Sequence, residues 1–331
     1  MRAMVLCAGL GTRLRPITEV WPKPAVPLLG QPLIRHTLRA LRRAGITELG
    51  INTFHLPEVM EQCVRREWTH LTVSSEVGEI QGTGGGVRGL RAFLSGGDFV
   101  VMNGDVLFDV DVSSVVAAHK ASGAAATMVL LPMPEGAKYN AVETDGGGDV
   151  RKIAGKGPGG ERLAPWHFSG MHVMTPAVFD FMAERGPEDI NHDVYLRMIG
   201  KGLRVYGHVV RERLYWSDLG TLERYVATHR DILFGQVKGF VEEPRGAGNF
   251  WAASTASLSD VQVSGPAWFG AGCTLGKGVR IGSATSVGPG AVVGDGAQLN
   301  RCIVLDGAKV PGGQLYEDKV FFGERVLDAA P

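Results

Sequence analysis

The chain has few cysteines, and they are not arranged in pairs. No two of them have Cys-x-x-Cys spacing, and the nine histidines show no metal-binding spacing either. These absences exclude a disulfide framework and a cysteine-based zinc site. We therefore expect a cytoplasmic protein, in a reducing compartment. The four thiols are Cys7, Cys63, Cys273 and Cys302.

Charge imbalance and long apolar runs are absent as well. Lys and Arg number 34, Asp and Glu also number 34, and no run of five like charges occurs. The balance does not indicate a nucleic-acid or membrane surface, so a small-molecule substrate is the default. The apolar start, Met1–Leu10, is too short to span a bilayer, and we interpret it as a first strand.

A length of 331 residues suggests about two domains. Over residues 1–235, apolar runs of strand length alternate with helical periodicity, which predicts an α/β fold with a mostly parallel, Rossmann-like sheet. The expected strands are Met4–Ala8, Glu48–Thr53, Leu71–Ser74, Phe99–Asn103 and Ala125–Leu131, and the expected helices are Leu33–Arg43, Pro57–Glu67, Gly86–Phe93 and Val112–Lys120.

Residues 236–257 are interrupted by Pro, Gly, Ala and Ser, and we expect the connection between domains there. In residues 258–331 an aliphatic or aromatic residue recurs every six residues and is often followed by Gly. This repeat predicts a short left-handed parallel β-helix. We expect the repeated side chain to point inward and the Gly to allow a sharp corner. The alternative interpretation, a Gly-rich linker, would not keep the same six-residue phase over eight repeats. The repeat positions are Val263, Phe269, Leu275, Ile281, Val287, Val293, Leu299 and Leu305, and the glycines are Gly270, Gly276, Gly282, Gly288 and Gly294.

A glycine-rich turn leaves the first strand at Cys7-Ala8-Gly9-Leu10-Gly11-Thr12-Arg13, and Pro22-Lys23-Pro24 follows. Such a turn lets backbone N–H groups approach a phosphate, and two cations can neutralise a triphosphate. The turn is not a Walker A loop, because it does not end in Gly-Lys-Ser/Thr. It is not a dinucleotide-binding fingerprint either, because the third Gly and the acid at the end of the second strand are missing. A plain strand-to-loop turn is the alternative, which Arg13 and Lys23 disfavour.

The segment Gly9-x-Gly11-Thr12-Arg13-Leu14-x-Pro16, followed by Pro22-Lys23-Pro24, resembles the signature of sugar-1-phosphate nucleotidyltransferases, the NDP-sugar pyrophosphorylases. The resemblance implies a GT-A-like domain that joins an NTP to a sugar 1-phosphate and releases pyrophosphate. It implies that Arg13 binds the departing β- and γ-phosphates and Lys23 the α-phosphate. The implied nucleotide-binding residues of this turn are Ala8, Gly9, Gly11, Thr12 and Arg13.

Two acidic residues are candidate metal ligands. Asp105 follows the predicted strand Phe99–Asn103, and Asp218 lies in a segment that resembles the family's Trp-x-Asp-x-Gly-Thr motif. A carboxylate at the carboxyl edge of a sheet suits Mg²⁺, which takes few protein ligands. The alternatives are a turn or helix-capping role for each Asp. The resemblance implies that both acids share one Mg²⁺.

Further motifs resemble the family's base and sugar segments. Gly82-Thr83-Gly84 resembles the base-recognition loop, although composition alone allows a plain glycine turn. Asn140 stands where relatives have Gly, and Gly155 stands where many have a sugar-gripping Glu. The implied sugar-phosphate residues are Asn140, Glu143, Lys156, Ser169 and Gly170.

Base and sugar stay open between several interpretations. A uridylyltransferase acting on an N-acetylmuramate-like or related hexose 1-phosphate is the first choice, with mannose-1-phosphate guanylyltransferase, glucose-1-phosphate thymidylyltransferase and a catalytically silent regulatory paralogue as alternatives. Acyl transfer by the β-helix is disfavoured, because the last histidine, His229, precedes every repeat. We expect a homo-oligomer, assembled through the β-helix, with no nucleic-acid or membrane partner.

Overall fold

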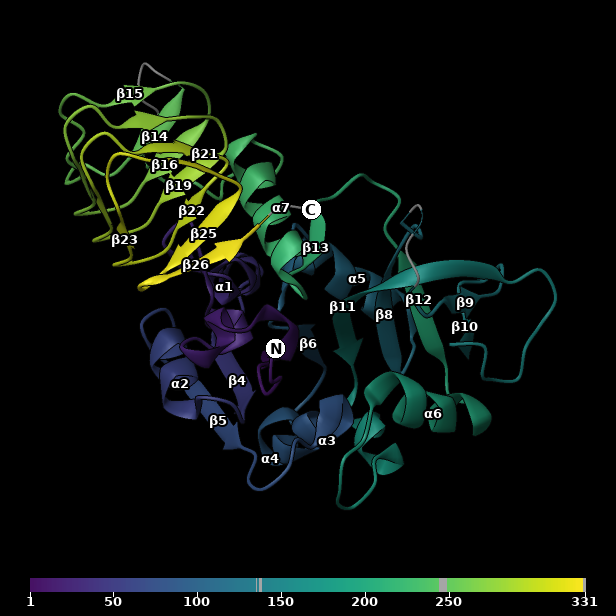
Figure 1. Ribbon diagram of the computed structural model, residues 1–331. Coiled ribbons are helices and arrows are strands. Elements are labelled where there is room, and N and C mark those ends of the chain that lie inside the picture. The colour runs from purple at the N-terminus through teal and green to yellow at the C-terminus, as the bar shows by residue number, and fades with distance from the viewer. Residues whose placement is uncertain (135, 137–138, 244–248, 330–331) are drawn as a thin grey trace. The chain divides into compact units, whose positions relative to one another are not determined.

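The computed structural model describes residues 1–134, 136, 139–243 and 249–329 (Figure 1). The chain forms two compact units. Unit 1 comprises Met1–Leu10, Trp21–Pro24 and Ile34–Trp216, and unit 2 comprises Gly11–Val20, Ala25–Leu33 and Ser217–Pro331. The two short N-terminal segments are therefore grouped with the C-terminal part. The domain boundaries expected at residues 235 and 257 stay predictions.

Unit 1 is built on a nine-stranded sheet. Its strands are β1 (Arg2–Leu6), β4 (Glu48–Thr53), β5 (Leu71–Ser75), β6 (Phe99–Asn103), β8 (Ala126–Leu131), β9 (Val142–Thr144), β10 (Val150–Ile153), β11 (Ala164–Met174) and β12 (Val205–Val209). The order is β10-β9-β11-β6-β1-β4-β5, with β8 beside β11 and β12 beside β8. Strands β6, β1, β4 and β5 run parallel, whereas β11 is antiparallel to β6 and β8. The predicted parallel core is confirmed, and antiparallel strands extend it.

The central strand β1 is covered on both faces. Ala3, Met4 and Val5 are fully buried, although successive residues of a strand point to opposite faces. Met4 packs with Val87 and Leu90 in the main core cluster of the unit. A strand buried on both faces forms a continuous apolar run, which is why its pattern could be identified from the sequence.

The helices of unit 1 are α1 (Ile34–Arg43), α2 (Pro57–Arg65), α3 (Gly82–Gly89), α4 (Arg91–Leu94), α5 (Val112–Ser122) and α6 (Leu196–Gly200). Helix α3 lies against β1 and β4, and α5 lies against β8, β11 and β12. The helix expected over Gly86–Phe93 begins at Gly82 instead and breaks at Leu90. Every helix in the described residues is too short or too polar to cross a membrane.

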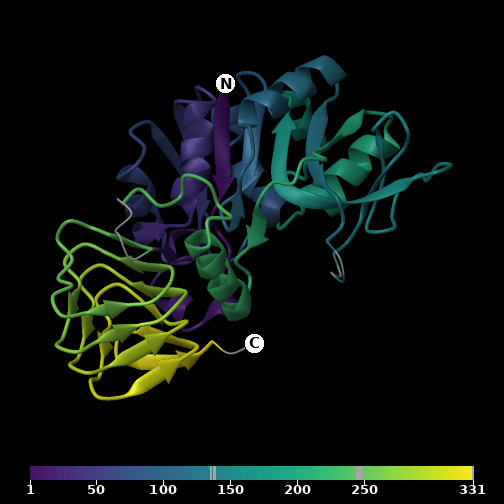
Figure 2. The same cartoon turned by 90° about the horizontal axis from the view of Figure 1, so that it is seen from above.

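Unit 2 contains helix α7 (Leu222–Leu233) and a parallel β-helix, whose stacked coils are visible in Figures 1 and 2. Its strands are β14 (Phe250–Ala252), β15 (Gln262–Val263), β16 (Ala267–Phe269), β17 (Thr274–Leu275), β18 (Arg280–Ile281), β19 (Thr285–Val287), β20 (Val292–Val293), β21 (Gln298–Asn300), β22 (Ile303–Val304), β23 (Lys309–Val310), β24 (Leu315–Glu317), β25 (Lys319–Phe322) and β26 (Arg325–Asp328). From β15 to β22, each strand pairs in parallel with its equivalent one coil later, which makes three faces. The predicted β-helix is confirmed. Strand β14 pairs with β16, although it falls within the expected connection.

Two details of the repeat differ from expectation. Val287 pairs with Val304, so Val304 rather than Leu305 continues the inward stack, because the corner at Arg301 contains one residue fewer. The repeat glycines also serve a different purpose from the one expected. A Cβ at Gly276 would lie 2.2 Å from the Asp295 carboxylate of the next coil. These glycines are required by close stacking, and other glycines take the positive φ at the corners.

Candidate active site

A pocket of about 190 Å³ in unit 1 is lined by half of the predicted nucleotide-binding residues, together with Lys23 and Asp105. It lies at the carboxyl ends of β1, β4 and β6, the edge at which parallel sheets bind ligands. Its walls include the first glycine turn, the base-loop segment and the predicted metal ligand. The lining residues are Leu6, Ala8, Gly9, Lys23, Pro24, Asn52, Ile80, Gly82, Thr83, Asn103 and Asp105.

Lys23 and Asp105 form an ion pair in this pocket. The Lys23 Nζ donates to Asp105 Oδ2 at 2.7 Å. Lys23 is only 7% exposed, so the ion pair replaces contacts with water that burial removes, whereas 38% of the Asp105 side chain is exposed. Gly104 lets the turn sit tightly here, because a Cβ would lie 2.8 Å from the Leu6 carbonyl oxygen. A buried cation and an accessible carboxylate therefore face one cavity.

The second half of the glycine turn belongs to unit 2. Gly11 has φ 61 and precedes a 3-10 turn over Thr12–Leu14, and the Thr18 hydroxyl donates to the Gly11 carbonyl at 2.9 Å. The Arg13 guanidinium lies against Gly220, where a Cβ would be 2.9 Å from Arg13 Nη2. Within unit 2, Arg13, which is predicted to bind the triphosphate, thus lies beside the Trp-x-Asp-x-Gly-Thr motif, which is predicted to bind the metal.

Asp218 ends strand β13 (Trp216–Asp218), just before helix α7. The helix is capped by Thr221, whose hydroxyl accepts from the Arg224 N–H at 3.4 Å, so Asp218 is not the N-cap. Its carboxylate is ion-paired with the Arg224 side chain. Arg224 was not predicted as a site residue, although its position in the first turn after the motif is a usable signal.

The predicted metal ligands belong to different units, Asp105 to unit 1 and Asp218 to unit 2. Their joint binding of one cation stays a prediction. In the described part of the chain, no three Asp, Glu, His or Cys side chains gather as a metal site. A Mg²⁺ site with two carboxylates and several waters does not need such a group.

The base-loop segment is bonded to residues more than 100 positions later. The Thr83 hydroxyl donates to Asp189 Oδ2 at 3.1 Å and accepts from the Ile190 N–H at 2.8 Å. The Gly84 N–H donates to the Glu188 carbonyl at 2.8 Å. Gly82 and Thr83 line the pocket, whereas Gly84 faces Glu188 and lies outside the lining.

Glu188 is a buried residue that fixes this loop and was not predicted. It is 5% exposed and its carboxylate is paired with Arg197 and, at 3.5 Å, with Arg88. Arg88 also donates to the Gly186 carbonyl at 2.6 Å. The Glu188 carboxylate therefore has two cationic partners. The main-chain carbonyl of Glu188 accepts from Gly84 and so supports the loop.

The predicted sugar-phosphate residues are distributed over β9, β10 and β11. Glu143 lies on β9 opposite Lys152, and Lys156 is exposed just beyond β10. Gly170, on β11, has φ 91 and lies over Asn103, because a Cβ would be 3.1 Å from the Asn103 amide nitrogen. Gly170 therefore lies against a residue that lines the pocket.

Ser169 is buried beside Gly170, and its carbonyl accepts from the Trp216 indole N–H at 2.8 Å. Asn140 is exposed and follows Tyr139. Tyr139, His167 and Trp216 form an aromatic cluster, with the His167 ring centroid 4.2 Å from that of Tyr139 and 4.4 Å from that of Trp216. Sequence reasoning did not single out His167, which no motif marks.

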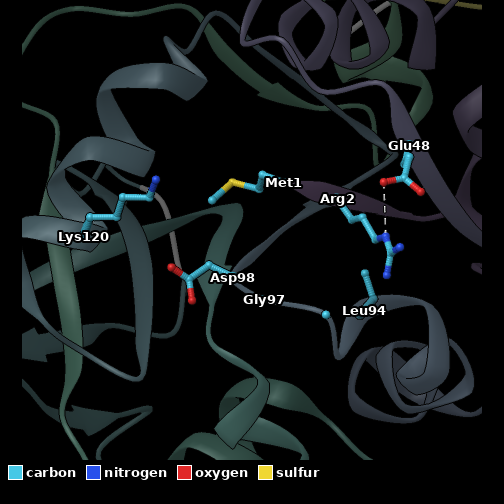
Figure 3. Close-up of a pocket in the computed structure, with 8 residues that line it drawn as sticks. Met1, Arg2, Glu48, Leu94, Gly97, Asp98 and Lys120 are labelled. Atoms are coloured by element: carbon cyan, nitrogen blue, oxygen red, sulfur yellow. Dashed lines mark hydrogen bonds and ion pairs between the residues drawn. The ribbon is translucent and has the colours of Figure 1, made fainter.

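A second pocket, of about 370 Å³, lies at the opposite edge of the sheet (Figure 3). It is found where β1 and β4 begin and before β6. Arg2 Nε and Glu48 Oε2 are 3.3 Å apart on one side, and Asp98 and Lys120 lie on the other. Parallel strands direct ligands to their carboxyl ends, so we place the candidate active site at Lys23 and Asp105 despite the smaller cavity.

Comparison with known proteins identifies the family of the chain. Residues 2–234 match the family described as Nucleotidyl transferase. A UTP–glucose-1-phosphate uridylyltransferase of Synechocystis sp. is 29% identical, over 99% of this chain and 89% of that protein. Probable mannose-1-phosphate guanylyltransferase 3 of Oryza sativa subsp. japonica is 30% identical, over 94% of this chain and 82% of that protein. Mannose-1-phosphate guanylyltransferase 1 of Arabidopsis thaliana is 28% identical, over 80% and 75%. The chain belongs to the nucleotidyl transferase family and, within it, to the sugar-1-phosphate nucleotidyltransferases.

Proposed function

We propose that the protein transfers a uridylyl group from UTP to a hexose 1-phosphate, with release of pyrophosphate. For this uridylyl transfer, the preferred sugar is N-acetylmuramate-like, and glucose is the alternative sugar. The Gly82–Gly86 loop supports uridylyl transfer, because it resembles that of muramate-like uridylyltransferases. The relative from Synechocystis, which matches almost the whole chain, bears a name that gives UTP and glucose 1-phosphate as substrates.

One observation supports the site above all others. A buried Lys23 and an accessible Asp105 are paired at 2.7 Å in a pocket that is bordered by two glycine segments. Glycine segments let a nucleotide approach the backbone closely, a lysine can bind its α-phosphate, and a carboxylate can bind a cation. This set matches a triphosphate with its metal better than it matches a neutral ligand.

Enzymes of this family generally use a divalent metal. We propose Mg²⁺, with Asp105 and Asp218 as its protein ligands. The donor set fits, because Asp105 presents a partly exposed carboxylate to the pocket and hard cations prefer oxygen ligands. When bound, Mg²⁺ would neutralise phosphate charge and polarise the phosphoryl oxygens.

The residues of the chain have to overcome repulsion between two anionic substrates. In our proposal, Lys23 leaves Asp105 and pairs with the α-phosphate, while Arg13 pairs with the β- and γ-phosphates that depart. The sugar-phosphate oxygen attacks the α-phosphorus in line, and the bond to pyrophosphate breaks opposite. No covalent enzyme intermediate is needed, and orientation can contribute roughly 7–11 kcal/mol. Lys156 is proposed to bind the phosphate of the sugar.

Guanylyl transfer to mannose 1-phosphate is the second candidate. Relatives that bear this name cover most of the chain, as the rice protein does with 94%. Thymidylyl transfer to glucose 1-phosphate and a silent regulatory paralogue are further alternatives, the last disfavoured because Arg13, Lys23, Asp105 and Asp218 are all present. The β-helix is proposed to mediate self-association.

A substrate matrix tests these proposals. UTP, GTP, dTTP and ATP are combined with N-acetylmuramate, glucose and mannose 1-phosphates, with and without Mg²⁺, and pyrophosphate release is measured. We expect the highest kcat/KM with UTP, and none without divalent metal. A preference for GTP and mannose 1-phosphate would establish the second candidate, and no release with any pair would support the silent paralogue.

A further inference from the structure

A polar bridge forms part of the wall of the nucleotide pocket, and it starts at Asn52, which lines the pocket. This residue lies near the carboxyl end of β4 and is 2% exposed. Its Oδ1 accepts from the Cys7 N–H at 2.9 Å, and its Nδ2 donates to Glu76 Oε1 at 2.7 Å. Both ends of the amide are therefore used inside the protein.

Glu76 continues the bridge towards the base loop. Its second oxygen, Oε2, accepts from the Gln81 N–H at 2.7 Å, and its own N–H donates to the Thr53 carbonyl at 2.8 Å. Gln81 is the N-cap of α3, directly before Gly82. The bridge thus runs from Cys7, which precedes Ala8 and Gly9, to the residue before the base loop.

Helix α3 also rests directly on the bridge. A Cβ at Gly86 would lie 2.5 Å from Asn52 Nδ2, so only a glycine permits this approach. Side chains at the carboxyl ends of β4 and β5 therefore join the two glycine segments to each other.

We propose that Asn52 and Glu76 are positioning residues for the nucleotide. This inference rests on the proposed function, in which the first glycine turn binds phosphates and the Gly82–Thr83 segment binds the base. The bridge holds these two segments at the spacing that one NTP requires. Neither residue reaches the reacting atoms, so the effect is on NTP affinity and not on sugar 1-phosphate affinity.

The direction of each hydrogen bond makes the proposal testable. Asn52→Asp places two carboxylates face to face, because Oδ1 must still accept from Cys7. Glu76→Gln leaves an amide donor against either Asn52 or Gln81. In the double variant the Asp accepts from the new Gln, whose oxygen accepts from Gln81, and the bridge is restored with its polarity reversed.

The experiment measures steady-state kinetics with both substrates varied, and NTP binding by calorimetry without sugar phosphate. We expect each single variant to raise KM and Kd for the NTP by about tenfold or more, with the sugar-phosphate KM changed by less than about twofold. The double variant should recover most of the NTP affinity. Asn300→Asp is the matched control, because Asn300 donates to Glu317 at 3.0 Å in the β-helix.

Three outcomes would overturn the inference. They are unchanged NTP affinity in both single variants, equal changes for both substrates, and failure of the double variant to recover while its thermal unfolding midpoint equals that of the wild type. A wild-type protein without turnover on any substrate pair would contradict the proposed function instead, and calorimetric NTP binding would still decide the role of the bridge.

Discussion

Gly82→Ala is the substitution whose effect can be worked out most fully from the structure. Gly82 has φ +71, and a Cβ there would lie 2.5 Å from the Glu188 carbonyl oxygen. Gly78 is a matched control in the preceding loop, with φ +83 and no atom within 4 Å of the place that a Cβ would take. Both substitutions strain the backbone, but only the one at Gly82 forces two segments apart.

The two costs can be separated by size. An L-residue in the left-handed region costs about 1–2 kcal/mol, and this applies equally to both variants. An ordinary contact begins at 3.4 Å, so the alanine at position 82 needs the loop to move by roughly 1 Å. A misplacement of about 1 Å can lower catalysis about a hundredfold. We therefore expect kcat/KM for the NTP to fall about a hundredfold in Gly82→Ala and to stay near the wild-type value in Gly78→Ala.

The assay compares kcat/KM at low NTP with the thermal unfolding midpoint of each variant. The unfolding midpoints of the two variants should fall by similar amounts. A larger fall in Gly82→Ala would measure the clash of the new Cβ with the Glu188 carbonyl oxygen. If Gly82→Ala were as active as Gly78→Ala, the contact with Glu188 would not position the loop, and the assignment of Gly82 to the nucleotide site would be refuted.

Three further predictions follow from charged and titratable groups. Asp105→Asn should abolish metal-dependent turnover, whereas Asp145→Asn, in an ion pair elsewhere on unit 1, should not; near-normal activity of the first would remove it from the metal site. Burial lowers the pKa of His172 to about 3 and of His229 to about 4, so the unfolded state binds protons first as pH falls below about 6.5. Urea titrations at a series of pH values should therefore show that the contribution of these histidines to the free energy of unfolding is fully present above that pH and falls below it, by up to about 1.4 kcal/mol per pH unit for each histidine. The free energy of unfolding should fall less steeply with pH in His172→Gln than in the wild type, and an equal slope would contradict this prediction. Burial also raises the pKa of the Cys7 thiol well above its usual value, so mass spectrometry should find it unalkylated by iodoacetamide in native protein at pH 8 and modified in urea; fast native labelling would argue against it.

Local patterns were enough to predict the parallel core. The strands Glu48–Thr53 and Phe99–Asn103 were predicted with the bounds that the structure has, because they are apolar runs ended by polar residues. Strands β9 and β10 were not predicted, since they are short and carry charged side chains such as Glu143 and Lys152. Their strand character comes from pairing with each other and with β11, which no local pattern records.

The candidate site divides in the same way. Glycines and charges near Lys23 could be recognised because they are close together in a motif, and Asp105 because it follows a buried strand. The residues that fix their positions could not be recognised. Asn52, Glu76 and Glu188 are ordinary polar residues in the sequence, and they become important only because the fold brings them to main-chain N–H groups of distant segments, which need acceptors.

The β-helix shows the division most simply. Its six-residue period, its inward side chains and its number of faces can be read from residue order, because each coil contacts only its neighbours and the pattern repeats locally. The reason for glycine at Gly276 and the loss of one residue near Arg301 became clear only when adjacent coils were stacked. Periodicity is a property of the chain, whereas close approach of two backbones depends on where the fold brings them.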